Sequence, residues 1–195
     1  MMQTTKSDEI NMKSHSAFTL LEMLITLSIS VILMTLSFPS LKQIYEKSQD
    51  DQFLTQLLQT IELAKFEAQT KHIPVSLCKS KNQQSCNDGD WKEGYLIFFD
   101  EQEDGIVRDE RQIITVRHAL SPHGELRWRS YPFYRHYLHF SPTGLTRSDN
   151  GTFWHCHGQS VRWAVILNKQ ARAYTMYPDQ QGKIIDDHGK PLSCS

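Results

Sequence analysis

An apolar segment near the N-terminus, residues 18–41, constrains this chain more than any other feature of its sequence. Glu22 is the only charged residue in it. As an α-helix, residues 18–38 extend over roughly 30 Å, the thickness of the hydrocarbon core of a bilayer. A carboxylate near one end of such a helix costs on the order of 2.5–3.5 kcal/mol if it has to lie in lipid. We therefore expect Glu22 to have a partner and a function.

The residues at the start of this segment, Ala17-Phe18-Thr19-Leu20-Leu21-Glu22, resemble the processing site of type IV pilins and pseudopilins. In that family a prepilin peptidase removes a short polar leader on the cytoplasmic side, and the new N-terminal Phe is methylated. The resemblance implies cleavage between Ala17 and Phe18, N-methylation of Phe18, and a role for Glu22 in filament assembly. The chain departs from the usual family pattern by having Ala17 in place of Gly.

A role for Glu22 in assembly agrees with physical chemistry, because cleavage creates an ammonium group at Phe18. In a helical filament, Glu22 of one subunit can pair with this amine of its neighbour, and an unpaired carboxylate is strongly disfavoured in an apolar core. The alternatives are an ordinary signal anchor and a cleaved secretory signal. A secretory signal has a shorter apolar core of about 7–15 residues, followed by a site of small residues. Either Met1 or Met12 can be the first residue of the leader, and the sequence is compatible with both starts.

The chain is expected to have three parts: a leader (1–17), a transmembrane and filament-core helix half (18–41), and a periplasmic head (42–195). The head includes an amphipathic helix half, because apolar residues recur at spacings of three and four from Leu54 to Ala68. The helix is predicted over about 18–70, before Pro74. Charged residues such as Asp50 are assigned to its solvent-facing sides. The protein would cross the inner membrane once and later enter a pilus or pseudopilus.

Beyond Pro74 the pattern changes to short segments in which apolar and polar residues alternate, separated by Gly and Asn turns. This pattern is typical of half-buried antiparallel strands. The fold class is therefore α+β: a pilin-like fold with the long N-terminal helix packed on antiparallel β-sheet. The predicted strands are 75–78, 94–99, 113–116, 125–129, 136–140, 152–156, 161–167 and 172–176.

The order of features in this second part narrows the resemblance. It is similar to the GspH/FimT family of minor pseudopilins and minor pilins. The resemblance implies a structural subunit of a type IV pilus or a type II secretion system, with other minor subunits, the major pilin and prepilin peptidase as partners. The features are a Cys-loop-Cys, Trp91, Gly94, Asp100, Asp104-Gly105, Ser141-Pro-x-Gly144 and Asn150-Gly151-Thr152.

Four cysteines, Cys78, Cys86, Cys156 and Cys194, allow three pairings. Disulfides are the expected state behind an exported membrane anchor. Pairing of Cys78 with Cys86 is favoured because they enclose a short polar loop, and Cys156 would then tie down the C-terminus through Cys194. Buried thiols are the alternative.

No metal site, cofactor or enzymatic activity is predicted. His155 and His157 share one face of a strand, and His136 and His139 lie nearby in sequence, but one imidazole pair does not complete a tetrahedral site. The acidic loop 100–105 begins like a calcium loop and is interpreted as a solvated hairpin loop, because later positions do not fit. Common catalytic motifs are missing from the sequence.

Nucleic-acid binding is the less favoured alternative function. Residues 120–195 carry nine Lys and Arg against five acidic residues, a net charge of +4. Arg127 and Arg129 share one strand face with Trp128 on the other, and such sets can bind nucleic-acid backbone and bases. Arg172 lies where related DNA receptors have a Gly-Arg-x-Arg turn, but the Gly and one Arg are missing. The alternative is that the aromatic rings belong to the core and the arginines to a solvated edge.

Overall fold

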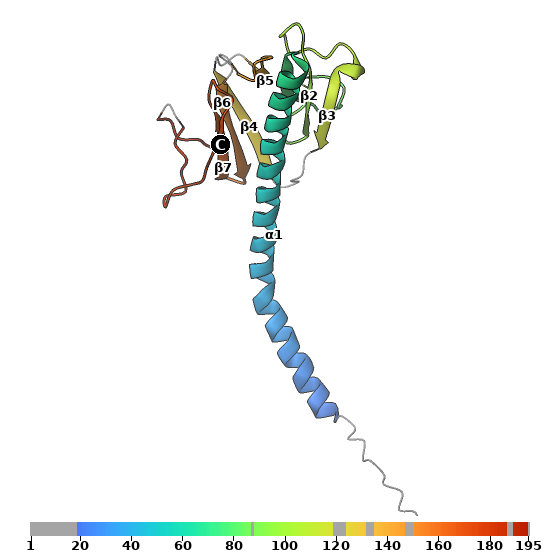
Figure 1. The fold of residues 1–195 in the computed structure, drawn as a ribbon. Coiled ribbons are helices and arrows are strands. Elements are labelled where there is room, and N and C mark those ends of the chain that lie inside the picture. Colours follow the sequence, from blue (N-terminus) through green and yellow to red (C-terminus); the bar gives the residue numbers. More distant parts are fainter. Residues whose placement is uncertain are drawn as a thin grey trace, which may run out of the picture. The chain divides into compact units, whose positions relative to one another are not determined.

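The computed structural model describes residues 19–86, 88–118, 124–131, 135–146, 150–186 and 189–194, without the side chains of residues 36, 37, 39 and 40. The chain divides into two compact units, Met1–Tyr45 and Glu46–Ser195. A long helix, α1 (Leu20–Lys71), contributes to both units. We call its first part, residues 20–45, the stem. The second unit, which holds all of the sheet structure, is the head (Figure 1).

The helix α1 ends where the chain first takes a left-handed backbone conformation. His72, directly after Lys71, has a φ of 55°. A residue in this conformation commonly follows the last turn of a helix, and a proline one or two residues later prevents the helix from continuing. Pro74 has that position here, and the first strand begins at Val75.

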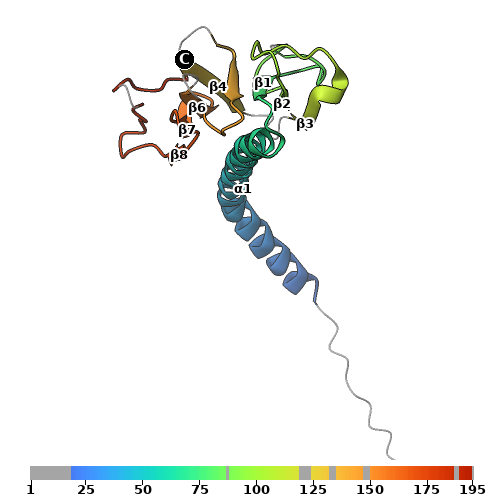
Figure 2. The same cartoon turned by 45° about the horizontal axis from the view of Figure 1, so that its top comes forward.

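The head contains two antiparallel sheets of four strands each. One sheet, sheet A, has the order β3-β2-β1-β5, and the other, sheet B, has the order β4-β6-β7-β8 (Figure 2). The chain passes from sheet A into β4 of sheet B, returns for β5, and then completes sheet B. The strands are β1 (Val75–Lys79), β2 (Gly94–Phe99), β3 (Ile113–His118), β4 (Gly124–Tyr131), β5 (Tyr137–Phe140), β6 (Asn150–His157), β7 (Ser160–Leu167) and β8 (Ala173–Met176), and a short 3-10 helix, η1 (Glu110–Gln112), precedes β3.

One continuous core joins the head part of α1 to both sheets. The helix contributes a buried stripe that includes Phe53, Leu57 and Ile61, and each of these side chains is at most 2% exposed. Sheet A contributes side chains such as Leu77, and sheet B contributes side chains such as Phe153. Because one helix face covers both sheets, this core fixes the position of the sheets in the head.

The predicted α+β class, a long helix packed on antiparallel sheet, is confirmed. All eight strands lie at the predicted positions with ends that differ by a few residues, but the sequence did not predict their division into two sheets. The assignment of Asp50 to a solvent-facing side was wrong. Asp50 is 5% exposed and faces β6, because its carboxylate has hydrogen-bonding partners there.

Candidate functional site

The stem begins with a capped helix end at the residue before α1. The backbone N–H of Glu22 donates to Thr19 Oγ1 at 3.2 Å, and the N–H of Met23 donates to the Thr19 carbonyl at 3.2 Å. Thr is a favoured capping residue because its hydroxyl satisfies one of the first amides of a helix. Glu22 lies in this first turn, where the positive end of the helix dipole favours a carboxylate.

The described apolar side chains of the stem are exposed in the single chain, and four of its hydroxyl groups bond within the helix. Leu20 is 82% exposed, and the stem's other large apolar residues with described side chains are also exposed. Thr26, Ser28, Ser30 and Thr35 each donate to a carbonyl three or four residues earlier. Such internal bonds remove the cost of placing these hydroxyls in apolar surroundings. Between residues 20 and 41, Glu22 is therefore the charged group that an apolar partner surface has to accommodate.

The predicted processing site lies outside the described residues, because both Ala17 and Phe18 do. Within the described part of the chain, no helical segment is both long enough and apolar enough to pass through a membrane. The predicted membrane half, residues 18–41, also includes Phe18 and four side chains that the structure does not describe. Its membrane role stays a prediction.

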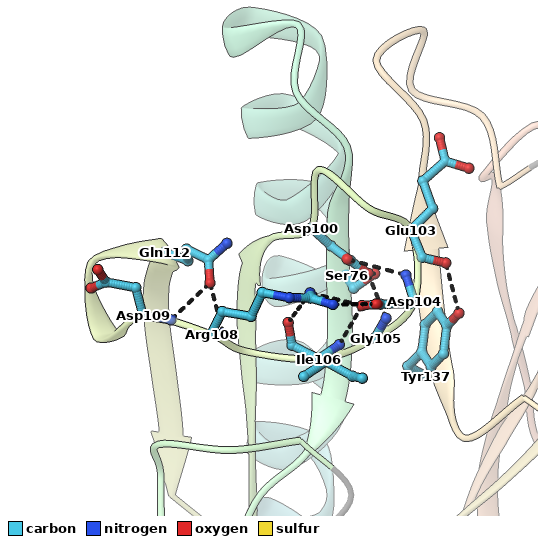
Figure 3. A network of polar contacts seen from close by, with 10 residues as sticks. All are labelled: Ser76, Asp100, Glu103, Asp104, Gly105, Ile106, Arg108, Asp109, Gln112 and Tyr137. Atoms are coloured by element: carbon cyan, nitrogen blue, oxygen red, sulfur yellow. Dashed lines mark hydrogen bonds and ion pairs between the residues drawn. The ribbon is translucent and has the colours of Figure 1, made fainter.

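The acidic loop after β2 is organised by a buried carboxylate (Figure 3). Asp100 is 1% exposed, and its oxygens accept hydrogen bonds from Ser76 Oγ at 2.7 Å, from the N–H of Gly105 at 2.9 Å and from the N–H of Asp104 at 3.2 Å. Asp104 pairs with Arg108, which holds the pKa of the Asp104 carboxyl below its usual value. The two carboxylates are thus held by protein donors, and the loop does not need a cation for its shape.

Ser76, Asp100 and His139 come together on sheet A, although they do not form a nucleophilic site. All three are buried, and Ser76 Oγ lies 2.7 Å from Asp100 Oδ2 and 3.3 Å from His139 Nδ1. In a hydrolase the carboxylate orients the histidine and the hydroxyl faces substrate. Here the hydroxyl itself binds the carboxylate, so the three residues stabilise the loop.

A second buried polar cluster connects α1 to β6. Asp50 Oδ1 lies 2.8 Å from His155 Nε2, and Trp163 Nε1 donates to the Asp50 carbonyl at 3.1 Å. His157 Nδ1 and Arg162 Nε approach the same carboxylate at 4.0 and 3.6 Å. Burial lowers the pKa of His155, and the contact with Asp50 opposes this shift. His155 and His157 therefore share a face as predicted, but their common neighbour is a carboxylate. Among the described residues no cluster is suited to hold a metal ion.

Arg127 and Arg129 hold the C-terminal segment, which we define as residues 177–186 and 189–194, against sheet B. Arg127 donates to Glu125 and also to the carbonyls of Ser193 and Cys194. Arg129 Nη1 lies 2.6 Å from Asp186 Oδ2, and the Asp186 side chain is 2% exposed. The guanidinium of Arg129 also lies over the ring of Trp154. Sequence reasoning missed this role because nothing in the strand pattern identifies Asp186 as a partner.

Arg172, the third arginine predicted as a possible nucleic-acid contact, does not lie near Arg127 and Arg129. Arg172 is exposed and precedes β8, at the opposite edge of sheet B from β4. Three strand spacings separate the two edges, about 14 Å. The three arginines therefore do not form one cationic surface.

Two disulfides close the head, in the pairing favoured from the sequence. Cys78 and Cys86 join the end of β1 to the loop that follows, and Cys156 joins β6 to Cys194 near the C-terminus. The second bond, with Arg127 and Arg129, holds the C-terminal segment against sheet B, and apolar residues of the segment and of the sheet form one cluster there. The cluster consists of Trp154, Cys156, Val161, Ala164, Ile184 and Leu192, with Cys194 packed against it.

An apolar stem with a single carboxylate, joined to a disulfide-bonded α+β head, is typical of the pilin and pseudopilin class. The comparisons with known proteins agree. Residues 12–38 match the prokaryotic N-terminal methylation motif. Residues 54–171, more than half of the 195 residues, match the family described as type II transport protein GspH. The chain belongs to this GspH family and is a minor pilin or pseudopilin.

Two crystal structures of the type IV minor pilin FimU from Pseudomonas aeruginosa are similar to this chain at 14% sequence identity. One covers 65% of this chain and 91% of its own, with a TM-score of 0.47. The other covers 76% of this chain and 98% of its own, with a TM-score of 0.49. No curated protein matches the chain.

Proposed function

We propose that the chain is a non-enzymatic structural subunit of a type IV pilus or a type II secretion pseudopilus. Before assembly it is anchored in the inner membrane by its stem, with the head in the periplasm. Prepilin peptidase cuts between Ala17 and Phe18, Phe18 is N-methylated, and other minor subunits and the major pilin are its partners. The observation that supports this most is the match of residues 12–38 to the methylation motif, together with an apolar segment, residues 18–41, whose only charged residue is Glu22.

Glu22 is proposed to pair with the Phe18 amine of a neighbouring subunit. The hydroxyls of Thr26, Ser28, Ser30 and Thr35 bond within their own helix, so they offer a neighbour little specificity. A lone carboxylate in an apolar bundle is strongly destabilised unless a cation neutralises it. The pairing therefore favours one axial stagger of adjacent stems over the others.

Mass spectrometry of the protein from membranes tests the processing step. The mature protein should begin at Phe18 and carry one N-terminal methyl group. When prepilin peptidase is inactivated, the same protein should retain residues 1–17. A mature chain that keeps its leader in the presence of active peptidase would refute the proposed processing.

Nucleic-acid binding is not proposed. Arg127 and Arg129, the arginines that could contact a phosphate backbone, both hold the C-terminal segment. Arg172 lies at the other edge of the same sheet.

A further inference from the structure

A cavity of about 430 Å³ lies in the head between β4 and the turn before β2. Its volume is in the range of sites that bind ligands, roughly 300–1,000 Å³. One wall is formed by residues 90–92 and the other by residues 125–128, with Trp154 contributing from β6. The lining residues are Asp90, Trp91, Lys92, Glu125, Leu126, Arg127, Trp128 and Trp154.

The cavity runs along the edge of a strand. Four consecutive residues of β4 line it, and successive side chains of a strand point to opposite faces of the sheet. Leu126 and Trp128 pack against the main core, whereas Arg127 reaches the C-terminal segment on the other face. Since these side chains point to opposite faces, all four residues can line one cavity only if it lies along the edge of the strand. Within the described ranges, β4 is also the terminal strand of sheet B, paired with β6 alone.

Aromatic rings give this edge an apolar floor. Trp91 lies 6.4 Å from Trp128 and 5.0 Å from Phe153, measured between ring centroids, and Trp128 lies 4.2 Å from Phe153. The apolar part of the cavity lining therefore consists of the rings of Trp91, Trp128 and Trp154 together with Leu126.

The charges around the cavity decide between classes of ligand. Asp90 and Glu125 are acidic, and Lys92 and Arg127 are basic, so the lining has no net charge. A polyanion would meet two carboxylates, whereas an extended peptide offers a neutral backbone. A strand edge pairs with such a backbone through main-chain hydrogen bonds, and a neighbouring pocket selects one side chain. Strand edge, aromatic floor and balanced charge all fit an extended polypeptide.

We propose that this groove binds an extended segment of a partner protein, which adds to sheet B as a fifth strand beside β4. An apolar or aromatic side chain of that segment lies against Trp91 and Trp128. The groove lies wholly in the head, so this proposal goes beyond the filament function and does not depend on Glu22.

The test uses the full-length chain in detergent micelles and a phage library of random twelve-residue peptides. Peptides selected on the chain are synthesised, and their binding is measured by fluorescence anisotropy. The variant Lys92→Trp fills the groove from an exposed position and should weaken binding at least tenfold. Lys169→Trp, an equal change at an exposed turn between β7 and β8, should leave binding unchanged. Thermal unfolding of both variants shows that they remain folded.

N-methylation of single peptide amides tests the strand pairing itself. Methyl groups at every second amide should abolish binding, and methyl groups at the intervening amides should not, because alternate amides of a strand point toward its neighbour. The proposal is overturned if no peptide is enriched, if Lys92→Trp binds the selected peptides as well as the parent chain does, or if N-methylation has no alternating effect.

Discussion

At the scale of single residues, two carboxylates of α1 have opposite environments. Glu22 lies on an exposed apolar stem, whereas Asp50 is buried against β6. Both are acidic residues of the same helix, and residue type alone does not show which of them is buried. Glu22 was identified because it lies in an apolar segment next to a processing motif. Asp50 lies among other charged residues, so its burial depends on His155 and Trp163, which are distant in sequence.

The burial of His155 should make the stability of the head depend on pH. Its pKa is lowered in the folded chain, so between that value and about 6.5 the unfolded chain binds a proton that the folded chain does not. The free energy of unfolding should therefore fall as the pH decreases through about 6.5. Urea unfolding between pH 5 and 8 measures this slope.

The variant His155→Gln should reduce this pH dependence, since Gln does not titrate. His136→Gln, at an exposed position, is the matched control and should leave the slope nearly unchanged. Equal slopes for the parent chain and His155→Gln would show that His155 does not cause the effect.

At the scale of elements, local sequence patterns predicted the helix and the strands, but they did not predict the contacts between residues that are distant in sequence. The helix and all eight strands follow from periodicity and turn residues, and the Cys78–Cys86 pair follows from close spacing. The pairing of β5 with β1 brings together residues about sixty positions apart, and no local pattern encodes it. The contacts of Arg127 and Arg129 with the C-terminal segment escaped prediction for the same reason.

The two disulfides should differ in their contribution to stability. The Cys156–Cys194 bond has a sequence separation of 38, against 8 for Cys78–Cys86. A longer closed loop restricts the unfolded chain more, so loss of the longer bond should cost about 2–5 kcal/mol and loss of the shorter one less. Chemical unfolding of paired Cys→Ser variants, 156/194 and 78/86, measures the difference. A larger loss from the 78/86 variant would contradict this ranking.

At the scale of the whole molecule, the chain combines an apolar stem with a folded head. Three clusters of buried apolar residues form the interior of the head, and two disulfides close it. The large apolar side chains described in the stem are exposed, and Glu22 is the one carboxylate among them. The processing motif and the apolar segment were sufficient to predict a pilin or pseudopilin because they are local features, and the order of features in the head narrowed the prediction to the GspH/FimT family.

Incorporation of Glu22 variants into filaments tests the central claim most directly. Sheared pili or pseudopili from cells that express the parent chain, Glu22→Gln or Glu62→Gln are compared by immunoblot, with membrane levels as the reference. Glu62 is an exposed glutamate on the head part of α1 and provides the control. We expect Glu22→Gln to reduce incorporation at least tenfold at equal membrane levels, and Glu62→Gln to have no effect. Full incorporation of Glu22→Gln would contradict the proposed pairing of Glu22 with the Phe18 amine of a neighbouring subunit.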